Sequence, residues 1–137
     1  MPWAGRVPDA WVLDASPVQV LVADDDADIL LLVRLRLERL GFEVLTAPDG
    51  AAALELVHTR APALAILDVS MPFLTGIEVT RTLREEGSSM PVILLTARAR
   101  DTDADVGAEA GATGYVTKPF TTRELEDAVR KALLVGV

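Results

Sequence analysis

The chain has 137 residues, a net charge of −8 at pH 7, no cysteine, and a hydrophobic share of 50%. This length suits one compact domain with a substantial apolar core, and the negative charge disfavours nonspecific binding to nucleic acid or acidic membranes, because the long-range field repels polyanions. The absence of cysteine excludes disulfides, thiolate metal sites and cysteine nucleophiles, and it fits the cytoplasm, where we expect the protein to act.

The first 17 residues, MPWAGRVPDAWVLDASP, differ in character from the rest. They lack the basic start and continuous apolar core of a signal peptide, and no stretch of the chain reaches the roughly 20 apolar residues of a membrane span. With three prolines and little periodicity, they predict an irregular N-terminal extension over residues 1–17, followed by one domain over residues 18–137. Packing on the domain, association and no role at all are open alternatives for the extension.

From residue 18 onward, short apolar runs alternate with stretches of helical spacing. The predicted strands span 18–23, 42–47, 63–67, 92–95 and 114–117. The predicted helices span 27–40, 51–60, 77–86, 102–110 and a last segment that starts at the capping box TTRE (121–124) and runs to about residue 134. This alternation predicts a doubly wound α/β domain, a five-stranded parallel sheet with helices on both faces. Right-handed crossovers then place the strand-to-helix loops along one edge of the sheet.

Polar side chains stand where four of these strands end. Asp24 and Asp25 follow the first strand, Asp68 follows the third, Thr96 follows the fourth and Lys118 follows the fifth. Ligands of open parallel sheets bind outside the carboxyl ends of the strands. We therefore expect these five residues to meet in one crevice.

Three of these residues predict a metal site. The carboxylates of Asp24, Asp25 and Asp68 would repel one another and raise one another's pKa in a shared pocket unless a cation lay between them. Oxygen-only ligands in a small, water-accessible cleft favour Mg²⁺ over zinc, and calcium would require more protein oxygens than this site offers. The residues therefore predict a magnesium site.

Asp68 is also suited to nucleophilic chemistry, because a carboxylate that attacks a phosphoryl group forms an acyl phosphate. Catalysis of such a transfer is mostly positioning and neutralisation of charge. The ammonium of Lys118 and the hydroxyl of Thr96 can each contact one phosphoryl oxygen. The only histidine, His58, lies on a predicted helix at a different edge, so triad chemistry has little support.

Four motifs carry a family resemblance: VLVADDDADIL, LAILDVSMPFLTGIEV, VILLTARA and GATGYVTKPF. Together they resemble the receiver domain of bacterial two-component response regulators over about residues 18–134. The resemblance implies a flavodoxin-like fold with strand order 2-1-3-4-5. It implies that Asp68 is the phosphoacceptor and that Mg²⁺ is bound by Asp24, Asp25, Asp68 and the backbone carbonyl of Ser70. A receiver of this kind catalyses its own phosphorylation and dephosphorylation.

The resemblance also implies a conformational switch. Thr96 and Lys118 would bind the phosphoryl group, Thr96 would shift toward it, and the ring of Tyr115 would turn inward. The readout face would consist of the helix at 102–110, the strand at 114–117 and the last helix, and it could also support a homodimer. The implied partner is a sensor histidine kinase or a phosphotransfer protein, with no nucleic acid or membrane bound by this domain. The partner kinase, the output and whether the domain stands alone are left open.

Three other functions compete with this one. A Mg²⁺-dependent phosphohydrolase often carries an acid two residues after its nucleophile, but Ser70 stands there and protonates a leaving group poorly. An interaction module without chemistry is disfavoured by the complete acid, threonine and lysine set. A flavin binder is conceivable by fold, but the acidic first loop would repel the flavin phosphate.

Overall fold

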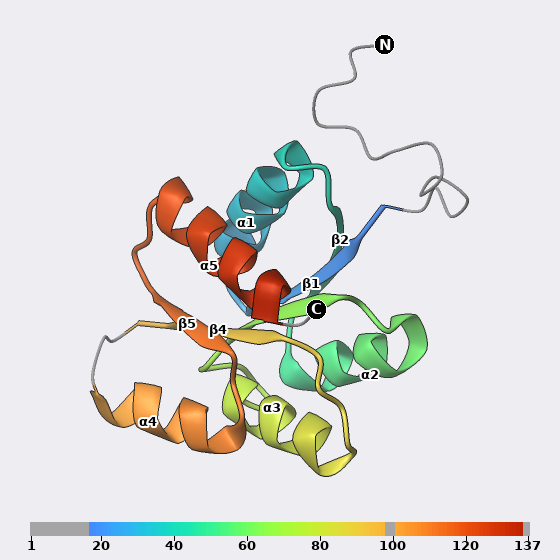
Figure 1. Ribbon diagram of the computed structural model, residues 1–137, viewed down its shortest axis with the longest axis vertical. Helices are drawn as coiled ribbons and strands as arrows, with labels where there is room; N and C mark the ends of the chain where they lie inside the picture. Colours follow the sequence, from blue (N-terminus) through green and yellow to red (C-terminus); the bar gives the residue numbers. More distant parts are fainter. Residues whose placement is uncertain (1–16, 98–100, 136–137) are drawn as a thin grey trace.

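The computed structural model describes residues 17–97 and 101–135. Strands and helices alternate along the chain (Figure 1). The strands are β1 (Gln19–Ala23), β2 (Glu43–Ala47), β3 (Leu64–Asp68), β4 (Val92–Thr96) and β5 (Gly114–Thr117). The helices are α1 (Ala27–Arg39), α2 (Gly50–Arg60), α3 (Gly76–Glu85), α4 (Asp101–Ala110) and α5 (Thr122–Val135).

The five strands form one parallel sheet in the order β2-β1-β3-β4-β5. The predicted fold class and strand order are therefore confirmed. β3 is the central strand, with β1 on one side and β4 on the other. Because all the strands run the same way, their carboxyl ends lie along one edge of the sheet, and the order reverses between β1 and β3.

Two apolar layers cover the faces of the sheet. Ile66 and Leu67 are adjacent on β3 and belong to opposite layers, as the two-residue period of a strand requires. Ile66 belongs to the same core cluster as Leu37 of α1 and Leu125 of α5, whereas Leu67 belongs to the same cluster as Leu83 of α3. Figure 1 shows α1 and α5 on one side of the sheet and α2, α3 and α4 on the other. Both faces of the central strand are buried, so the residue at its end is held rigidly.

The predicted element boundaries agree with the observed ones to within one residue. The predicted capping box of α5 is present: the backbone N–H of Glu124 donates to Thr121 Oγ1 at 3.0 Å, and the N–H of Thr121 donates to Glu124 Oε1 at 3.2 Å. The last helix begins at Thr122, directly after that box. The predicted domain boundary at residue 17 remains a prediction, because residues 1–16 lie outside the described part of the chain.

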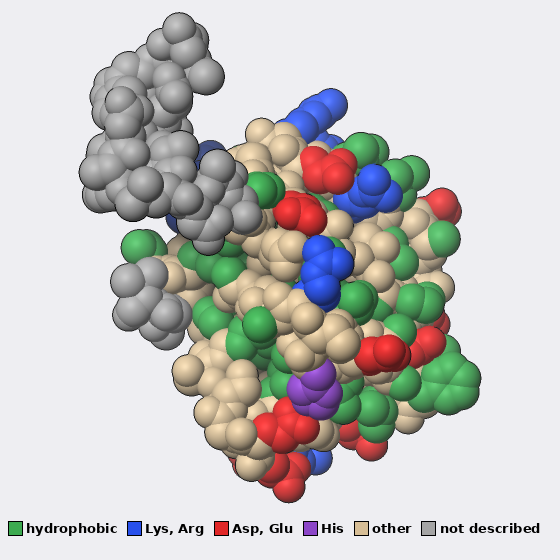
Figure 2. Space-filling model, turned by 90° about the vertical axis from the view of Figure 1, so that its right-hand side faces the viewer, with side chains coloured by type: hydrophobic (Ala, Val, Ile, Leu, Met, Phe, Trp, Pro, Cys, Tyr) green, Lys and Arg blue, Asp and Glu red, His purple; other side chains and the backbone are tan. Residues whose placement is uncertain are grey.

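The surface mixes charges of both signs. On the face that Figure 2 shows, acidic and basic side chains are interspersed, and hydrophobic side chains form small separate patches. Surface pairs include His58 with Glu86, whose Nε2 and Oε1 lie 2.8 Å apart, and Arg60 with Glu43. None of the helices that the structure describes is long and apolar enough to cross a bilayer.

Candidate functional site

The predicted site residues come together at the carboxyl edge of the sheet. Asp24 directly follows β1, Asp68 is the last residue of β3, and Lys118 directly follows β5. Thr96 is the last residue of β4. Since β1, β3, β4 and β5 are consecutive in the sheet, the parallel register aligns their ends. The predicted convergence of these strand ends is therefore confirmed.

The three acids form a compact cluster. Asp24, Asp25 and Asp68 each offer a carboxylate oxygen, and these oxygens lie within 4.8 Å of one another. Asp24 is fully buried and Asp68 is 5% exposed, whereas Asp25 is exposed. Ligands that share one Mg²⁺ at about 2.1 Å lie no more than about 4.2 Å apart. The oxygen-only donor set therefore fits Mg²⁺ after a small adjustment, with water completing the shell.

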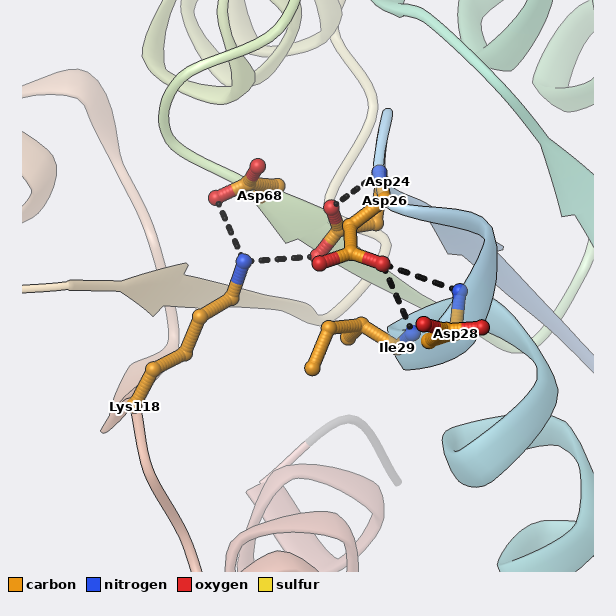
Figure 3. Close-up of polar contacts among 6 residues, drawn as sticks. All are labelled: Asp24, Asp26, Asp28, Ile29, Asp68 and Lys118. Carbon is orange, nitrogen blue, oxygen red and sulfur yellow. Dashed lines mark hydrogen bonds and ion pairs between the residues drawn. The ribbon is translucent and has the colours of Figure 1, made fainter.

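Lys118 reaches into this cluster from the end of β5. Its Nζ lies 2.8 Å from Asp24 Oδ2 and 3.3 Å from Asp68 Oδ1. Figure 3 shows the ammonium between the two carboxylates. The peptide bond from Lys118 to Pro119 is cis. One cation thus partly neutralises two buried acids, which would otherwise be costly to hold side by side.

The titration of Asp68 reflects this crowding. Burial and then the negative charge of Asp24 raise the pKa of Asp68 from 3.8 to about 6, although Lys118 and the backbone N–H of Ser70 oppose the shift. For Lys118, burial alone would lower the pKa, but hydrogen bonds and charge from Asp24 and Asp68 outweigh it and raise the pKa. Asp68 is therefore protonated more readily than an ordinary aspartic acid but is ionised above about pH 6, and Lys118 is held as a cation.

Asp26 has a separate task beside the cluster. Its Oδ1 accepts hydrogen bonds from the backbone N–H groups of Asp28 at 2.9 Å and Ile29 at 3.4 Å, so it caps α1. The N–H of Asp26 donates to Asp24 Oδ1 at 2.9 Å (Figure 3). This bond orients the Asp24 carboxylate and leaves Oδ2 for Lys118. The start of α1 thus positions one acid of the site.

The loop after β3 folds back tightly over the end of the strand. Gly76 donates its N–H to Val69 O at 3.2 Å, and a Cβ atom at Gly76 would lie only 2.4 Å from the backbone oxygen of Asp68. Met71 is buried in the layer below. The predicted role of the Ser70 carbonyl as a metal ligand stays a prediction, although its N–H faces the Asp68 carboxylate.

One residue of this loop was not predicted. Phe73 has a φ of 69° and is 83% exposed. The N–H of Leu74 donates to Pro72 O at 2.8 Å, so Phe73 is the central residue of a tight three-residue turn with positive φ. The only sequence signal is the preceding proline, which favours a turn but does not say which residue takes the left-handed conformation.

The two predicted switch residues border a cavity. Thr96 is 4% exposed, whereas Tyr115 on β5 is 54% exposed. Both line a cavity of about 210 Å³ between β4, β5 and α4, together with Leu94, Gly107 and Ala112; we call it the α4 cavity. Thr96 thus connects the phosphoacceptor edge to this cavity, and Tyr115 lies at its exposed side.

The chain resembles known proteins over most of its length. A family model described as the response regulator receiver domain matches residues 20–130. PhoP, the alkaline phosphatase synthesis transcriptional regulatory protein of Bacillus subtilis, is 43% identical over 115 residues, which are 84% of this chain and 48% of PhoP. The transcriptional regulatory protein CseB of Streptomyces avermitilis is 44% identical over 119 residues, 87% of this chain and 50% of CseB. The chain thus spans about half the length of these two regulators.

Solved structures give the same picture. The receiver domain of the Francisella response regulator 1452 has a TM-score of 0.82 and 34% identity, covering 89% of this chain and all of that one (100%). The chemotaxis protein CheY4 of Vibrio cholerae has a TM-score of 0.81 and 31% identity, covering 85% of this chain and 99% of CheY4. Fold and sequence therefore indicate the same family.

Proposed function

The chain belongs to the family of response regulator receiver domains of two-component systems, and on this premise we propose that it accepts a phosphoryl group on Asp68. The donor is a sensor histidine kinase, a phosphotransfer protein or a small phosphodonor, and Mg²⁺ is the cofactor. The observation that carries the proposal is the cluster itself. Three carboxylates have oxygens within 4.8 Å of one another, and a lysine ammonium lies 3.3 Å from Asp68 Oδ1.

In the proposed reaction an oxygen of the ionised Asp68 carboxylate attacks the phosphorus of the donor. An O–P bond forms, the bond from phosphorus to the donor's nitrogen or oxygen breaks, and its electron pair leaves with the donor. Bound Mg²⁺ would supply charge neutralisation at the transferring phosphoryl group. Asp24 and Asp25 are the side chains that would hold it with Asp68, and the Ser70 carbonyl would be a further ligand.

Lys118 and Thr96 act on the transferred group in this proposal. The ammonium of Lys118 already contacts Asp68 Oδ1 and can contact an oxygen of the phosphoryl group once the carboxylate is phosphorylated. Thr96 ends the neighbouring strand β4 and can donate its hydroxyl to another oxygen. The movement of Thr96 would open space for the ring of Tyr115, which would turn inward and change the face formed by α4, β5 and α5.

That face is the proposed readout surface, acting on an output partner or on a second copy of the chain in the cytoplasm. Sedimentation with and without Mg²⁺ and beryllofluoride, which mimics the phosphoryl group, tests the homodimer. An unchanged mass in both conditions would argue against self-association. The match covers only about half of the two transcriptional regulators named above. We therefore propose that any contact with DNA belongs to a separate domain and that the receiver domain itself binds no DNA.

Incubation with acetyl phosphate and Mg²⁺, followed by intact-mass and peptide mass spectrometry, tests the phosphoacceptor role. We expect one phosphoryl group on wild type and none on Asp68→Asn. Label that persists on the variant would refute the assignment. The competing phosphohydrolase function predicts instead continuous release of phosphate from sugar phosphates over many turnovers.

A further inference from the structure

The α4 cavity is a feature of the described residues for which the proposed phosphoryl transfer requires no ligand. It has a volume of about 210 Å³. Its strand side consists of Leu94, Thr96 and Tyr115, and its helix side includes Gly107, Ala108 and Ala112. The walls are thus mostly apolar, and the cavity lies directly beyond the strand that ends at the phosphoacceptor edge.

The small residues on the described helix side explain why their own side chains leave this space open. The described helix-side residues are glycine and alanine, whose short side chains fill little of the space. Gly107 is buried, and a Cβ atom there would lie 2.7 Å from Leu94 Cδ1, so the helix backbone and the strand side chain approach closely at that point. The other contacts of α4 are mainly with α3. Small residues therefore keep the cavity open while α3 holds the helix in place.

We propose that the α4 cavity binds a small, neutral, monocyclic aromatic molecule. An enclosed apolar cavity of about 150 Å³ can bind benzene, so the space of about 210 Å³, which opens to solvent on one side, accommodates a ring with one or two small substituents. An ionic ligand is disfavoured, because the described residues of the lining carry no charge and burial of an unpaired charge is costly. Thr113, another lining residue, already accepts a hydrogen bond from the N–H of Val92 at 3.0 Å.

The ring of Tyr115 competes for the same space. Tyr115 pairs with Leu94 in the ladder between β4 and β5, and both residues line the cavity. In the present arrangement its side chain is 54% exposed. A ligand ring inside the cavity would keep the Tyr115 ring outside. This competition rests on the proposed function, in which phosphorylation turns Tyr115 inward.

Competition of this kind couples the cavity to the phosphoacceptor. The ladder pairs Asp68 with Leu95, and the next residue, Thr96, lines the cavity. If the phosphorylated arrangement fills the cavity with Tyr115, it must bind the aromatic molecule more weakly. By linkage, the ligand weakens beryllofluoride binding by the same factor. The occupant would therefore be a negative regulator of the switch.

Titration of the full chain with p-cresol, followed by amide NMR shifts, tests the site. We expect saturable shifts at Leu94, Gly107 and Ala112 and an affinity about tenfold lower in Ala108→Leu, which fills the cavity from an exposed helix position. Leu94→Phe fills it from the sheet side and serves as the second variant. Ala51→Leu, the same change at an exposed alanine of α2, should bind like wild type. Shifts that do not saturate, or an affinity in both filling variants equal to that of wild type, would overturn the proposal.

The competition is tested by repeating the titration with Mg²⁺ and beryllofluoride. The affinity for p-cresol should fall about tenfold in wild type but stay unchanged in Tyr115→Ala. Equal affinity in wild type under both conditions would overturn the competition. Phosphorylation of Asp68 is measured separately by mass spectrometry. Phosphorylation without p-cresol binding would refute only the cavity proposal, and binding without phosphorylation would refute only the proposed function.

Discussion

Asp68 is a buried carboxylate that is ionised at neutral pH. The buried negative charge lowers the stability of the fold but supplies the nucleophile for the proposed reaction. The Asp68 side chain is 5% exposed, lies next to the buried Asp24, and has a pKa raised to about 6. At neutral pH the folded protein must hold this carboxylate as an anion, which the unfolded chain does more easily. The same anion is the nucleophile that the proposed reaction needs. The site is therefore expected to be functional at the expense of stability.

Asp68→Asn is expected to stabilise the metal-free protein near neutral pH. Because the folded pKa is raised, the contribution of protonated Asp68 is fully present below pH 3.8 and is lost as the pH rises through about 6. The rise in pKa from 3.8 to about 6 corresponds to roughly 3 kcal/mol of unfolding free energy above pH 6. Urea unfolding in EDTA at about pH 7.5 and about pH 4 measures it, and the gain should shrink at the lower pH.

Asp127→Asn is the matched control, because the Asp127 side chain is 51% exposed and forms a surface ion pair with Arg130 at 3.9 Å. It should change the free energy of unfolding by no more than about 0.5 kcal/mol. An Asp68→Asn protein that is less stable than wild type at neutral pH would contradict the argument, since it would mean that the ionised carboxylate stabilises the fold.

Sequence alone was sufficient for some residues of the site and insufficient for others. Asp24, Asp68 and Lys118 were predictable because parallel strands align their ends, and the ion pairs confirm that these residues meet. The exposed, left-handed Phe73 was not, because glycine or asparagine usually takes such a conformation. The outward position of the Tyr115 ring was also not predictable, since it depends on how closely α4 packs on the sheet.

At the level of secondary-structure elements, the close packing of Gly76 on the end of β3 holds the loop over the site. Gly76→Ala is expected to destabilise the protein by about 1 to 3 kcal/mol, because the new Cβ would meet the Asp68 backbone oxygen at 2.4 Å. Displacement of β3 should also slow phosphorylation of Asp68 by acetyl phosphate. Thermal unfolding and the rate of mass increase measure the two effects.

Gly114→Ala is the control for this change, because a Cβ atom at Gly114 meets nothing within 4 Å. Its effect on stability should be small. If Gly76→Ala were as stable as Gly114→Ala, the contact between α3 and the end of β3 could not be as tight as described.

Ala61 ends α2 in a conformation that favours glycine. Its φ is 45° and its ψ is 60°, and its N–H donates to Val57 O. Ala61→Gly is expected to stabilise the protein by about 0.5 to 1 kcal/mol, because the left-handed conformation has no steric cost for glycine. Ala51→Gly, within the same helix, should instead destabilise by about 0.5 to 1 kcal/mol. Denaturant unfolding of both variants checks the opposite signs, and equal signs would refute the argument.

The small errors in the predicted boundaries have local causes. The sequence placed Gly50 in a turn, but Asp49 caps the helix through Ala52 N–H at 2.8 Å, so α2 starts at Gly50. The third strand was predicted to end at Leu67. The N–H of Val69 donates to Leu95 O at 2.8 Å, which extends the pairing and brings Asp68 into the strand. Apolar patterning cannot reveal such single hydrogen bonds.

For the whole molecule, a ligand that binds only the folded state must stabilise it. If Mg²⁺ binds the acid cluster, a concentration ten times the dissociation constant should add about 1.4 kcal/mol and raise the melting temperature by a few degrees. Asp25→Asn should remove most of this gain, because Asp25 belongs to the cluster. Asp28→Asn, an exposed acid of α1 outside the cluster, should keep it. A gain of equal size in both variants would indicate nonspecific screening.

The order of the strands shows the limit of patterning at this scale. Apolar periodicity predicts which segments are strands, but it does not say which strands are neighbours. The order β2-β1-β3-β4-β5 was expected from the family resemblance and is confirmed by the pairing. The alternation of strands and helices, in contrast, followed from the residues themselves.

A crystal structure of the chain with Mg²⁺ and beryllofluoride tests the central claim most directly. We predict Mg²⁺ bound by Asp24, Asp25 and Asp68, with the beryllofluoride group on the Asp68 carboxylate and Lys118 beside one of its fluorines. Electron density that showed neither group, with the three carboxylates separated and hydrated, would contradict the account.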